Sequence, residues 1–274
     1  MKQKDEWMTP LRKHWETPGA IGCDAGAMSR NFKLTIEYDG TRYFGWQRQV
    51  EKPTIQAEVE RVLSLVTRQP VIVKGSGRTD AGVHALGQTA SFHCDTRLTP
   101  KTFLRALNGL LPADIVIRDC CEVPDGFHAR YDVLAKTYHY QILNHPISSV
   151  VERDFSWHIR RPLNVAAMSE SLCCLVGTHD FKAFEGIGSP RTHTVRTIHR
   201  SEIIKNGNDR LRVVIKGDGF LRYMVRNIVG TLVRIGMGKK PPADMERILL
   251  SRDRNLAGAT APARGLFLVE VQYP

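Results

Sequence analysis

The stretch Gly75-Ser76-Gly77-Arg78-Thr79-Asp80-Ala81-Gly82-Val83-His84-Ala85 lies between two runs of strand-forming residues, 71–73 and 88–93. Glycine adopts backbone conformations that other residues avoid, so this glycine-rich segment predicts a tightly bent loop that a ligand can approach closely. Flanking strands hold such a loop in place, and reactive side chains are commonly presented in this way. The stretch therefore predicts a sheet in which two strands carry a rigid functional loop.

Asp80 supplies the carboxylate of this loop, and Arg78 lies two residues before it. A nearby guanidinium favours the charged form of a partly buried carboxylate, because it offsets the loss of hydration. An ionised and poorly hydrated aspartate is a candidate nucleophile. An Asp followed by a small residue and Gly is also a common turn, in which the carboxylate bonds to its own backbone. The loop alone leaves both interpretations open.

Strands and helices alternate on either side of the loop. Apolar residues alternate with polar ones over 32–38, which is typical of a half-buried strand. Further strands are predicted at 115–117, 135–144 and 266–271, with a hairpin at Asn206-Gly207, and helices at 54–66, 99–109, 164–175, 220–235 and 243–250. Because many of the links resemble hairpins, the pattern predicts an α+β fold with a mainly antiparallel sheet.

The elements fall into two comparable sets, which predicts two pseudo-repeated halves with flanking helices and a central basic cleft. We place an N-terminal catalytic half at residues 30–150 and a C-terminal half at residues 151–274, because Pro and Ser residues loosen the pattern near 145–165. Residues 1–29 show no sustained period and are expected to form a flexible N-terminal extension. Met28, just before the first strand, is a candidate start residue.

The charge of the chain favours a polyanionic partner. The 274 residues carry a net charge of +11, and such an excess is most often matched by nucleic acid. No apolar run approaches the roughly 18–20 residues that span a bilayer, and the first residues lack the apolar centre of a signal peptide, so a cytoplasmic protein without membrane contact is expected. The cysteines and histidines show no metal-ligand spacing, so no metal is expected.

Two further segments carry candidate site residues. Trp46, Gln47 and Arg48 follow the first strand in a loop, where a ring, an amide and a guanidinium suit RNA bases and phosphates. The alternative is an ordinary packed tryptophan beside a solvated arginine. Tyr138, on the predicted strand 135–144, is either a core tyrosine or a ring that stacks on an extruded base.

The predicted helix 220–235 carries Arg222, Arg226, Gly230 and Arg234 at intervals of four residues, along one row of its surface. A glycine in the middle of a helix costs about 1 kcal/mol relative to alanine, which suggests that another backbone comes close there. The arginines either form a solvated basic face or send at least one guanidinium inward to a buried carboxylate. Asp80 is the candidate for that carboxylate.

Taken together, these segments resemble the TruA family of tRNA pseudouridine synthases. The resemblance covers about residues 31–274, with the 75–85 loop and six further motifs in the family's order: YDGT at 38–41, GWQRQ at 45–49, HARY at 128–131, KTYHY at 136–140, MVRNIVGT at 224–231 and ARGLFL at 263–268. The segment 1–29 departs from the family, whose members usually begin near the first strand.

The resemblance implies a pseudouridine synthase fold and an isomerase that converts uridine to pseudouridine at positions 38, 39 and 40 of the tRNA anticodon stem-loop. Asp80 would be the nucleophile, and Arg78 and Arg226 would hold it ionised and help open the stem. Tyr138 would stack on the flipped uracil and assist proton transfer. Contacts with the substrate are expected from Tyr138, Arg78, Trp46, Gln47, Arg48, His84 and Arg222. Family members are homodimers that hold tRNA in paired basic clefts, so a homodimer is expected.

The isomerisation needs no cofactor, because substrate and product contain the same atoms. A carboxylate can add either to the pyrimidine ring or to the sugar carbon, and the sequence leaves both routes open. Two other functions also stay open: a tRNA-binding protein without catalysis, and an Asp-dependent nucleoside hydrolase. The hydrolase would commonly need a second carboxylate as acid or base.

Overall fold

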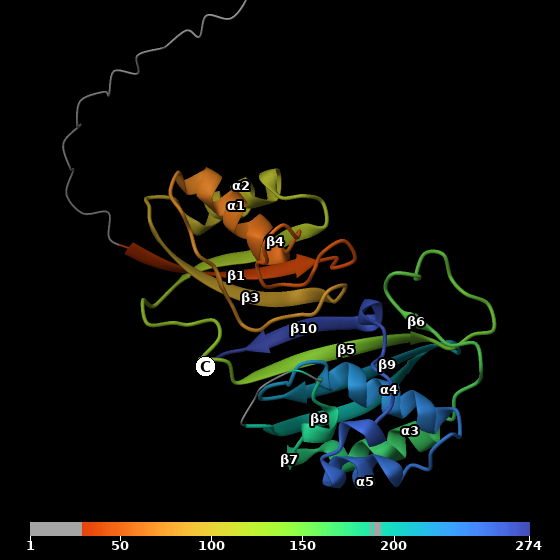
Figure 1. Cartoon of the computed structure of the whole chain (residues 1–274). Helices are drawn as coiled ribbons and strands as arrows, with labels where there is room; N and C mark the ends of the chain where they lie inside the picture. The colour runs from red at the N-terminus through yellow and green to blue at the C-terminus, as the bar shows by residue number, and fades with distance from the viewer. Residues whose placement is uncertain (1–28, 187, 189–192) are drawn as a thin grey trace, which may run out of the picture.

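The computed structural model describes residues 29–186, 188 and 193–274 (Figure 1). Its strands are β1 (Ser29–Tyr38), β2 (Lys74–Gly75), β3 (His84–Asp95), β4 (Ile115–Val123), β5 (Ala135–Leu143), β6 (Trp157–His158), β7 (Gly177–Asp180), β8 (Val195–Asn206), β9 (Arg210–Gly217) and β10 (Leu266–Gln272). Its α-helices are α1 (Ile55–Thr67), α2 (Pro100–Leu110), α3 (Val165–Leu172), α4 (Met224–Gly236) and α5 (Asp244–Ser251). The expected extension 1–29 lies outside the described residues except for Ser29.

The described strands form one sheet in the order β4-β1-β3-β10-β5-β9-β8-β7, with β2 beside β3 and β6 beside β5. The pair of β10 with β3 and the pair of β5 with β6 are parallel, and the other pairs are antiparallel. Helices α1 and α2 lie beside the N-terminal strands, and α3, α4 and α5 lie beside the C-terminal ones (Figure 1). The predicted α+β fold with a mainly antiparallel sheet is confirmed.

Local signals explain where several elements begin and end. Thr54 caps α1 by accepting a hydrogen bond from the Ala57 amide, and Thr99 caps α2 just before its first-turn proline. Gly207 adopts φ +71° in the turn between β8 and β9, as the predicted hairpin requires.

Two predicted elements differ from the structure. The apolar run 71–73 forms no regular strand, and the strand before the loop is the two-residue β2. Helix α4 begins at Met224 rather than at residue 220, because Tyr223 adopts a left-handed conformation that a right-handed helix does not contain. Arg222 therefore precedes the helix instead of starting its row of arginines.

The core joins the sheet to both sets of helices. In the N-terminal part, the Phe32 ring lies 5.3 Å from the Phe92 ring and 4.9 Å from the Phe103 ring, so β1, β3 and α2 share one aromatic cluster. In the C-terminal part, α4 is buried along most of its length, with Ile228 and Leu232 fully inaccessible. Burying side chains of this size stabilises a fold by about 1.5–3 kcal/mol each.

The centre of the sheet determines where distant segments meet. β10 pairs with β3 through Phe267 opposite His84, and with β5 through Leu268 opposite Tyr138. The loop before β3, the strand that carries Tyr138 and the end of the chain are therefore neighbours. The sheet runs without a break from the segment 30–150 into the segment 151–274, and the proposed division into two halves stays a prediction.

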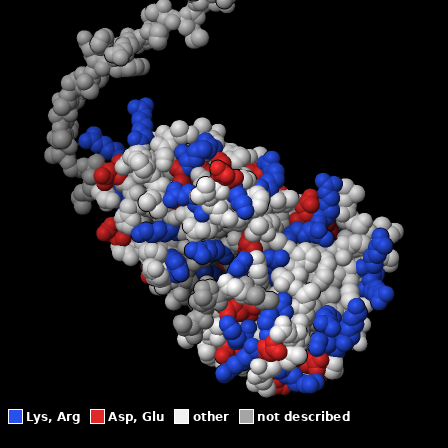
Figure 2. Space-filling view, in the orientation of Figure 1, with Lys and Arg blue, Asp and Glu red and all other residues white. Residues whose placement is uncertain are grey.

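Lys and Arg side chains gather across the middle of the face shown in Figure 2, between the N-terminal and C-terminal parts of the molecule. Within the described residues, no helix is both long and apolar enough to cross a bilayer. Over those same residues, no group of three or more His, Cys, Asp or Glu side chains is arranged to hold a metal ion.

Candidate active site

The loop between β2 and β3 is fixed from inside the protein by buried polar groups. The Ser76 amide donates to the Thr89 carbonyl at 2.7 Å, and the Ser76 hydroxyl donates to Gln88 Oε1 at 2.6 Å. Gln88 Nε2 in turn donates to the Gly77 carbonyl at 3.0 Å. Because Ser76 and Gln88 are both buried, these bonds are well shielded from water, and they hold the first half of the loop rigid.

The second half of the loop is held from behind by the segment around Trp46. Gly45 has φ +87°, and a Cβ at this position would stand 2.4 Å from the Thr79 carbonyl oxygen. The Trp46 amide donates to the same oxygen at 3.1 Å, and the Tyr38 and Thr79 hydroxyls are 2.7 Å apart. A Cβ at Gly75 would meet the Trp46 ring at 2.5 Å, so glycine is required there for the ring to pack.

Trp46 thus packs behind the loop. Only 2% of the residue is exposed, so its ring offers little surface on which a base could stack. This burial favours the packed-tryptophan alternative. Its contribution to the site is indirect, since it supports the backbone that presents Asp80.

Asp80 meets Arg226 at the front of the loop. Arg226 Nη1 donates to Asp80 Oδ2 at 3.1 Å, and the two side chains are 14% and 23% exposed, respectively. Arg226 Nε donates to the Ala261 carbonyl at 2.8 Å, and the Ala261 amide donates back to the Arg226 carbonyl at 3.1 Å. The Arg226 guanidinium is therefore held by the Ala261 carbonyl as well as by Asp80. Arg226 is thus the arginine that pairs with Asp80 in the structure.

The position of the Ala261 segment depends on Gly230 of α4. A Cβ at Gly230 would lie 1.8 Å from the Ala259 carbonyl oxygen, so only glycine allows this segment to cross the helix. The close backbone approach expected from a mid-helix glycine is confirmed. Arg226 lies one turn before Gly230 on α4, and its side chain extends toward Asp80.

Burial and charge act on Asp80 in opposite directions. Loss of hydration raises the pKa of Asp80 above its ordinary value, while Arg226, and to a smaller degree Arg222, lower it. The burial effect is the largest, so the arginines offset only part of it. The carboxylate is consequently more basic than an exposed aspartate while a guanidinium still stabilises its charge.

Tyr138 is close enough to this pair for the Asp80 charge to affect it. The residue is 7% exposed, and its ring packs edge-on against Phe220 at 5.0 Å. Burial raises the pKa of the Tyr138 hydroxyl well above its ordinary value, and the Asp80 charge raises it further. The hydroxyl is therefore neutral throughout the physiological range, and little of the residue is accessible to a ligand.

Arg78 occupies a different place from the one expected beside Asp80. Its Nε donates to Gln47 Oε1 at 3.2 Å, and both side chains are exposed. The cations that lower the pKa of Asp80 are Arg226 and Arg222. Arg48 points to another partner, since its Nη1 lies 3.0 Å from Glu60 Oε2. Contacts of Arg78, Gln47 and Arg48 with tRNA stay predictions.

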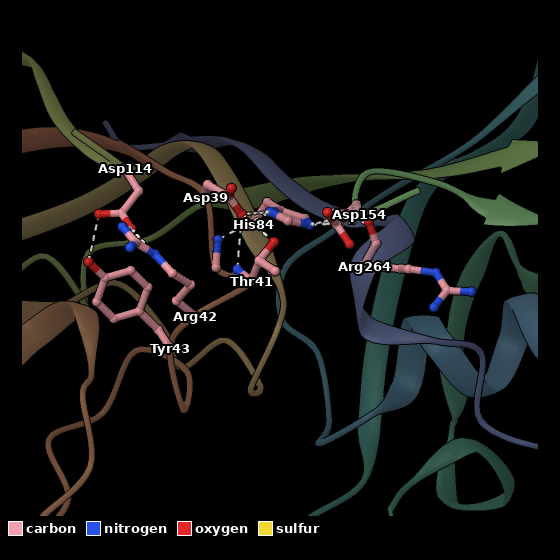
Figure 3. Close-up of polar contacts among 9 residues, drawn as sticks. Asp39, Thr41, Arg42, Tyr43, His84, Asp114, Asp154 and Arg264 are labelled. Atoms are coloured by element: carbon pink, nitrogen blue, oxygen red, sulfur yellow. Dashed lines mark hydrogen bonds and ion pairs between the residues drawn. The ribbon is translucent and has the colours of Figure 1, made fainter. Parts of the chain in front are cut away.

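His84 joins three segments of the backbone (Figure 3). Its Nδ1 accepts a hydrogen bond from the Gly40 amide at 3.1 Å and lies 3.1 Å from Asp39 Oδ1. Its Nε2 lies 3.0 Å from the Asp154 carbonyl and 3.2 Å from the Arg264 carbonyl, as a neutral imidazole protonated at Nε2 allows. Only 1% of His84 is exposed, so it has no surface for the expected contact with substrate. Its role in the structure is to link the backbones of Gly40, Asp154 and Arg264.

Sequence reasoning missed Tyr223. This residue separates Arg222 from α4, and both Arg222 and Arg226 lie over its ring. The predicted helix beginning at residue 220 hid it, because a regular helical pattern gives no sign of a left-handed residue at that position. The clustering of an aromatic residue among arginines was the available signal.

The site therefore combines a carboxylate of raised basicity, two cations and a neutral phenol. A carboxylate can form and break a bond to an electrophilic carbon, and surrounding arginines can bind phosphates. The groups that act on the pKa of Asp80 in the described part of the chain include no second carboxylate. This composition suits nucleophilic chemistry on a polyanion better than acid–base hydrolysis.

Comparison with known proteins agrees with this chemistry. The family model described as tRNA pseudouridine synthase matches residues 34–132 and 173–274, which is more than half of the chain. The matched ranges contain Asp80 and Arg226, whereas Tyr138 lies between them.

Three relatives extend the match over nearly the whole chain. The tRNA pseudouridine synthase A 2 of Clostridium tetani is 46% identical over 248 residues, covering 90% of this chain and 100% of that protein. The tRNA pseudouridine synthase A of Ruminiclostridium cellulolyticum is 44% identical over 89% of this chain and all of its own length, and that of Geobacter sp. is 44% identical over 89% of this chain.

The fold and the site thus define a class of RNA-modifying enzyme with a central sheet and an aspartate loop. The chain belongs to the TruA family of tRNA pseudouridine synthases. Members of this family are isomerases that act on tRNA.

Proposed function

We propose that this protein converts uridine to pseudouridine at positions 38, 39 and 40 of the tRNA anticodon stem-loop, with Asp80 as the nucleophile. The supporting observation is the 3.1 Å contact between Asp80 Oδ2 and Arg226 Nη1. This contact brings together two motifs that carry the resemblance to the family, 75–85 and 224–231, although they lie far apart in the sequence.

The reaction breaks the bond between N1 of uracil and C1′ of ribose and forms a bond between C5 and C1′. Asp80 adds either to C1′ or to the pyrimidine ring, the uracil turns, and the carboxylate leaves when C5 has joined the sugar. The C5 proton is then lost to a base, and N1 gains a proton, so substrate and product have the same composition. No oxidant, reductant or cofactor is consumed.

The side chains around Asp80 have complementary roles in this scheme. Arg226 stabilises the carboxylate in the free enzyme and again when it leaves, because the charge reappears at that step. Tyr138 stacks on the extruded uracil. Since burial keeps the Tyr138 hydroxyl neutral, it can take the C5 proton only while passing its own proton on, for example to water.

Exposed arginines beside the loop bind the phosphates that flank the target. Extruding a paired base costs a few kcal/mol, which these contacts offset. Arg78 is an exposed cation close in sequence to Asp80, so it contacts the RNA backbone in this proposal. A homodimer with paired basic clefts, and a location in the cytoplasm where tRNA is found, complete the proposal.

The two other functions receive less support. A tRNA-binding protein without catalysis would not need a half-buried carboxylate whose basicity is raised. A hydrolase of the usual kind would need an acid partner for Asp80, and arginines surround it instead.

The experiment uses the full chain and a tRNA transcript tritiated at uridine C5. Isomerisation releases the tritium, whereas hydrolysis of the glycosidic bond keeps it on the base. Asp80→Asn is expected to lower release by about 1000-fold or more, with tRNA affinity within about tenfold, or 1.4 kcal/mol. The exposed carboxylate of Asp119 provides a matched control, and Asp119→Asn should behave as the unmodified protein. Normal release from Asp80→Asn would refute the proposal.

A further inference from the structure

Tyr223 has a backbone conformation that is unusual for its place in the fold. It precedes α4 with φ 61° and ψ 2°, and its side chain makes no capping bond. A residue at the start of a helix is normally extended and caps the first turn. Arg68 and Arg252 are also left-handed, but they follow the last residues of α1 and α5, where this conformation is common.

A left-handed conformation is costly for a bulky residue, and such strain persists only where surrounding contacts hold it. Two of those contacts are cations. The guanidinium carbons of Arg222 and Arg226 lie 4.6 Å and 5.0 Å from the Tyr223 ring centroid, and Arg222 Nη2 donates to the Tyr223 hydroxyl at 2.9 Å. The electron-rich ring attracts both cations and so offsets the repulsion between them.

A glycine on a neighbouring segment fixes the ring. A Cβ at Gly186 would stand 2.5 Å from Tyr223 Cδ2, so only glycine leaves room for the ring. The Gly186 amide also donates to the Arg222 carbonyl at 2.8 Å, which anchors the backbone just before Tyr223. The ring and the chain that carries it are therefore positioned together.

We infer that Tyr223 is a positioning residue that holds Arg222 and Arg226 as a pair of cations facing Asp80. The inference deepens the proposed function and rests on it. The phosphates of tRNA compete with Asp80 for guanidinium groups, and unrestrained arginines would follow the larger charge. The Tyr223 ring keeps both cations near the carboxylate when RNA arrives, so that Asp80 stays ionised at the moment of attack.

The test compares Tyr223→Asn with Tyr223→Phe in the full chain, using tritium release from tRNA. Asparagine tolerates the left-handed conformation, so Tyr223→Asn should unfold at the same temperature as the unmodified protein or higher. Because the ring is lost, its kcat should nevertheless fall at least tenfold. Tyr223→Phe keeps the ring and loses only the hydroxyl, and it should retain at least a third of the original kcat.

Two further measurements separate positioning from simple folding effects. Without ordered cations the pKa of Asp80 rises, so the acid limb of the kcat profile should move to higher pH in Tyr223→Asn and stay in place in Tyr223→Phe. Arg68→Asn is the matched control, because it relieves a left-handed residue just after α1 that is not among the residues that pair with Asp80 or shift its pKa. It should leave kcat and its pH profile unchanged.

A normal kcat and pH profile in Tyr223→Asn would overturn the inference. A lower unfolding temperature in Tyr223→Asn, with a loss of kcat that Tyr223→Phe shares, would also overturn it, because the residue would then be only structural. Asp80→Asn distinguishes this failure from failure of the proposed function. An inactive Asp80→Asn beside a fully active Tyr223→Asn rejects the role of Tyr223 alone, whereas an active Asp80→Asn rejects the nucleophile itself.

Discussion

Asp80, in the loop before β3, and His84, the first residue of β3, are four residues apart, yet the fold uses them in opposite ways. Asp80 is 23% exposed and pairs with a guanidinium from another part of the chain through one of its two carboxylate oxygens. His84 is 1% exposed, and backbone groups of three segments use both of its nitrogens.

The difference shows that one short segment of the chain can supply both a candidate reactive group, Asp80, and a structural group, His84. A group whose hydrogen-bonding capacity is fully used inside the protein contributes stability, whereas a group that keeps accessible surface and an altered pKa can act on a ligand. Substitutions of Asp80 and its partners should therefore lower the rate of pseudouridine formation, and substitutions of His84 should lower the free energy of unfolding. The predictions below test this separation.

The largest effect is expected at the partner of Asp80. Arg226→Gln should lower kcat for pseudouridine formation by about 100-fold, because it removes a preorganised cation from a partly buried reacting group. Stability should change less, since the side chain keeps part of its packing. Arg234→Gln, at an exposed position on the same helix, is the control. If Arg226→Gln unfolds the protein instead, the pair is structural and the comparison with His84 fails.

At His84 the effect should appear in stability. His84→Ala is expected to lower the free energy of unfolding by about 2–3 kcal/mol, because it leaves buried backbone groups without partners and creates a cavity. Urea denaturation measures this, and the rate per folded molecule should stay within about threefold. His93→Ala, on the more exposed side of β3, should cost less than about 0.5 kcal/mol. A stable but inactive His84→Ala would place this imidazole in the chemistry.

The two residues should also respond differently to pH. Burial lowers the pKa of His84 below its ordinary value of 6.5, so the folded protein holds this proton less tightly than the unfolded chain. The contribution of His84 to the free energy of unfolding should therefore be fully retained above about pH 6.5 and should be lost as the pH falls below that value. His84→Gln should show a flatter pH dependence of the free energy of unfolding. An unchanged slope would mean that His84 is not the titrating group.

For the rate, the sign follows from Asp80. Burial raises the pKa of Asp80, so kcat should begin to fall at a higher pH than an exposed aspartate would allow. Arg226→Gln removes a group that lowers this pKa, and the acid limb of kcat should move further upward. If the acid limb of the kcat profile does not move in Arg226→Gln, Arg226 does not control the ionisation of Asp80.

The smallest effect is expected at Arg78, which is exposed beside Gln47. Arg78→Ala should weaken tRNA binding by about fivefold to tenfold and reduce the slope of log affinity against log salt by about 1, as the loss of one phosphate contact requires. Filter binding at several salt concentrations measures both. Gln47→Ala, which removes its protein partner, should leave the salt slope unchanged. A tRNA affinity unaffected by Arg78→Ala would remove Arg78 from the binding surface.

Much of the fold was predictable because its signals are local. The cap at Thr54, the proline after Thr99 and the turn at Gly207 each act within a few residues, and the elements they mark are present. Asp80 could be selected as a candidate nucleophile, although the loop alone left a structural turn open as the alternative. The strand expected at 71–73 was wrong, because an apolar run does not reveal whether the backbone finds a partner.

Residues that look equivalent in sequence were separated only by their distant contacts. Arg78 is two residues from Asp80 and Arg226 is 146 residues away, yet Arg226 holds the carboxylate. Trp46 and His84 belong to the same motifs as exposed residues, but packing buries them. Tyr223 was hidden because a helical pattern predicted regular geometry where the structure has a left-handed residue.

The sequence by itself determined the class of fold, the loop that carries the carboxylate and the need for a close approach at Gly230, because each depends on residue types within a short span. Only the tertiary structure decided which arginine faces Asp80, which aromatic rings remain accessible and what His84 supports. Those outcomes depend on the pairing of β10 with β3 and β5, which brings segments from both ends of the chain together. Partner choice across such distances is set by packing and burial, and residue types alone do not encode it.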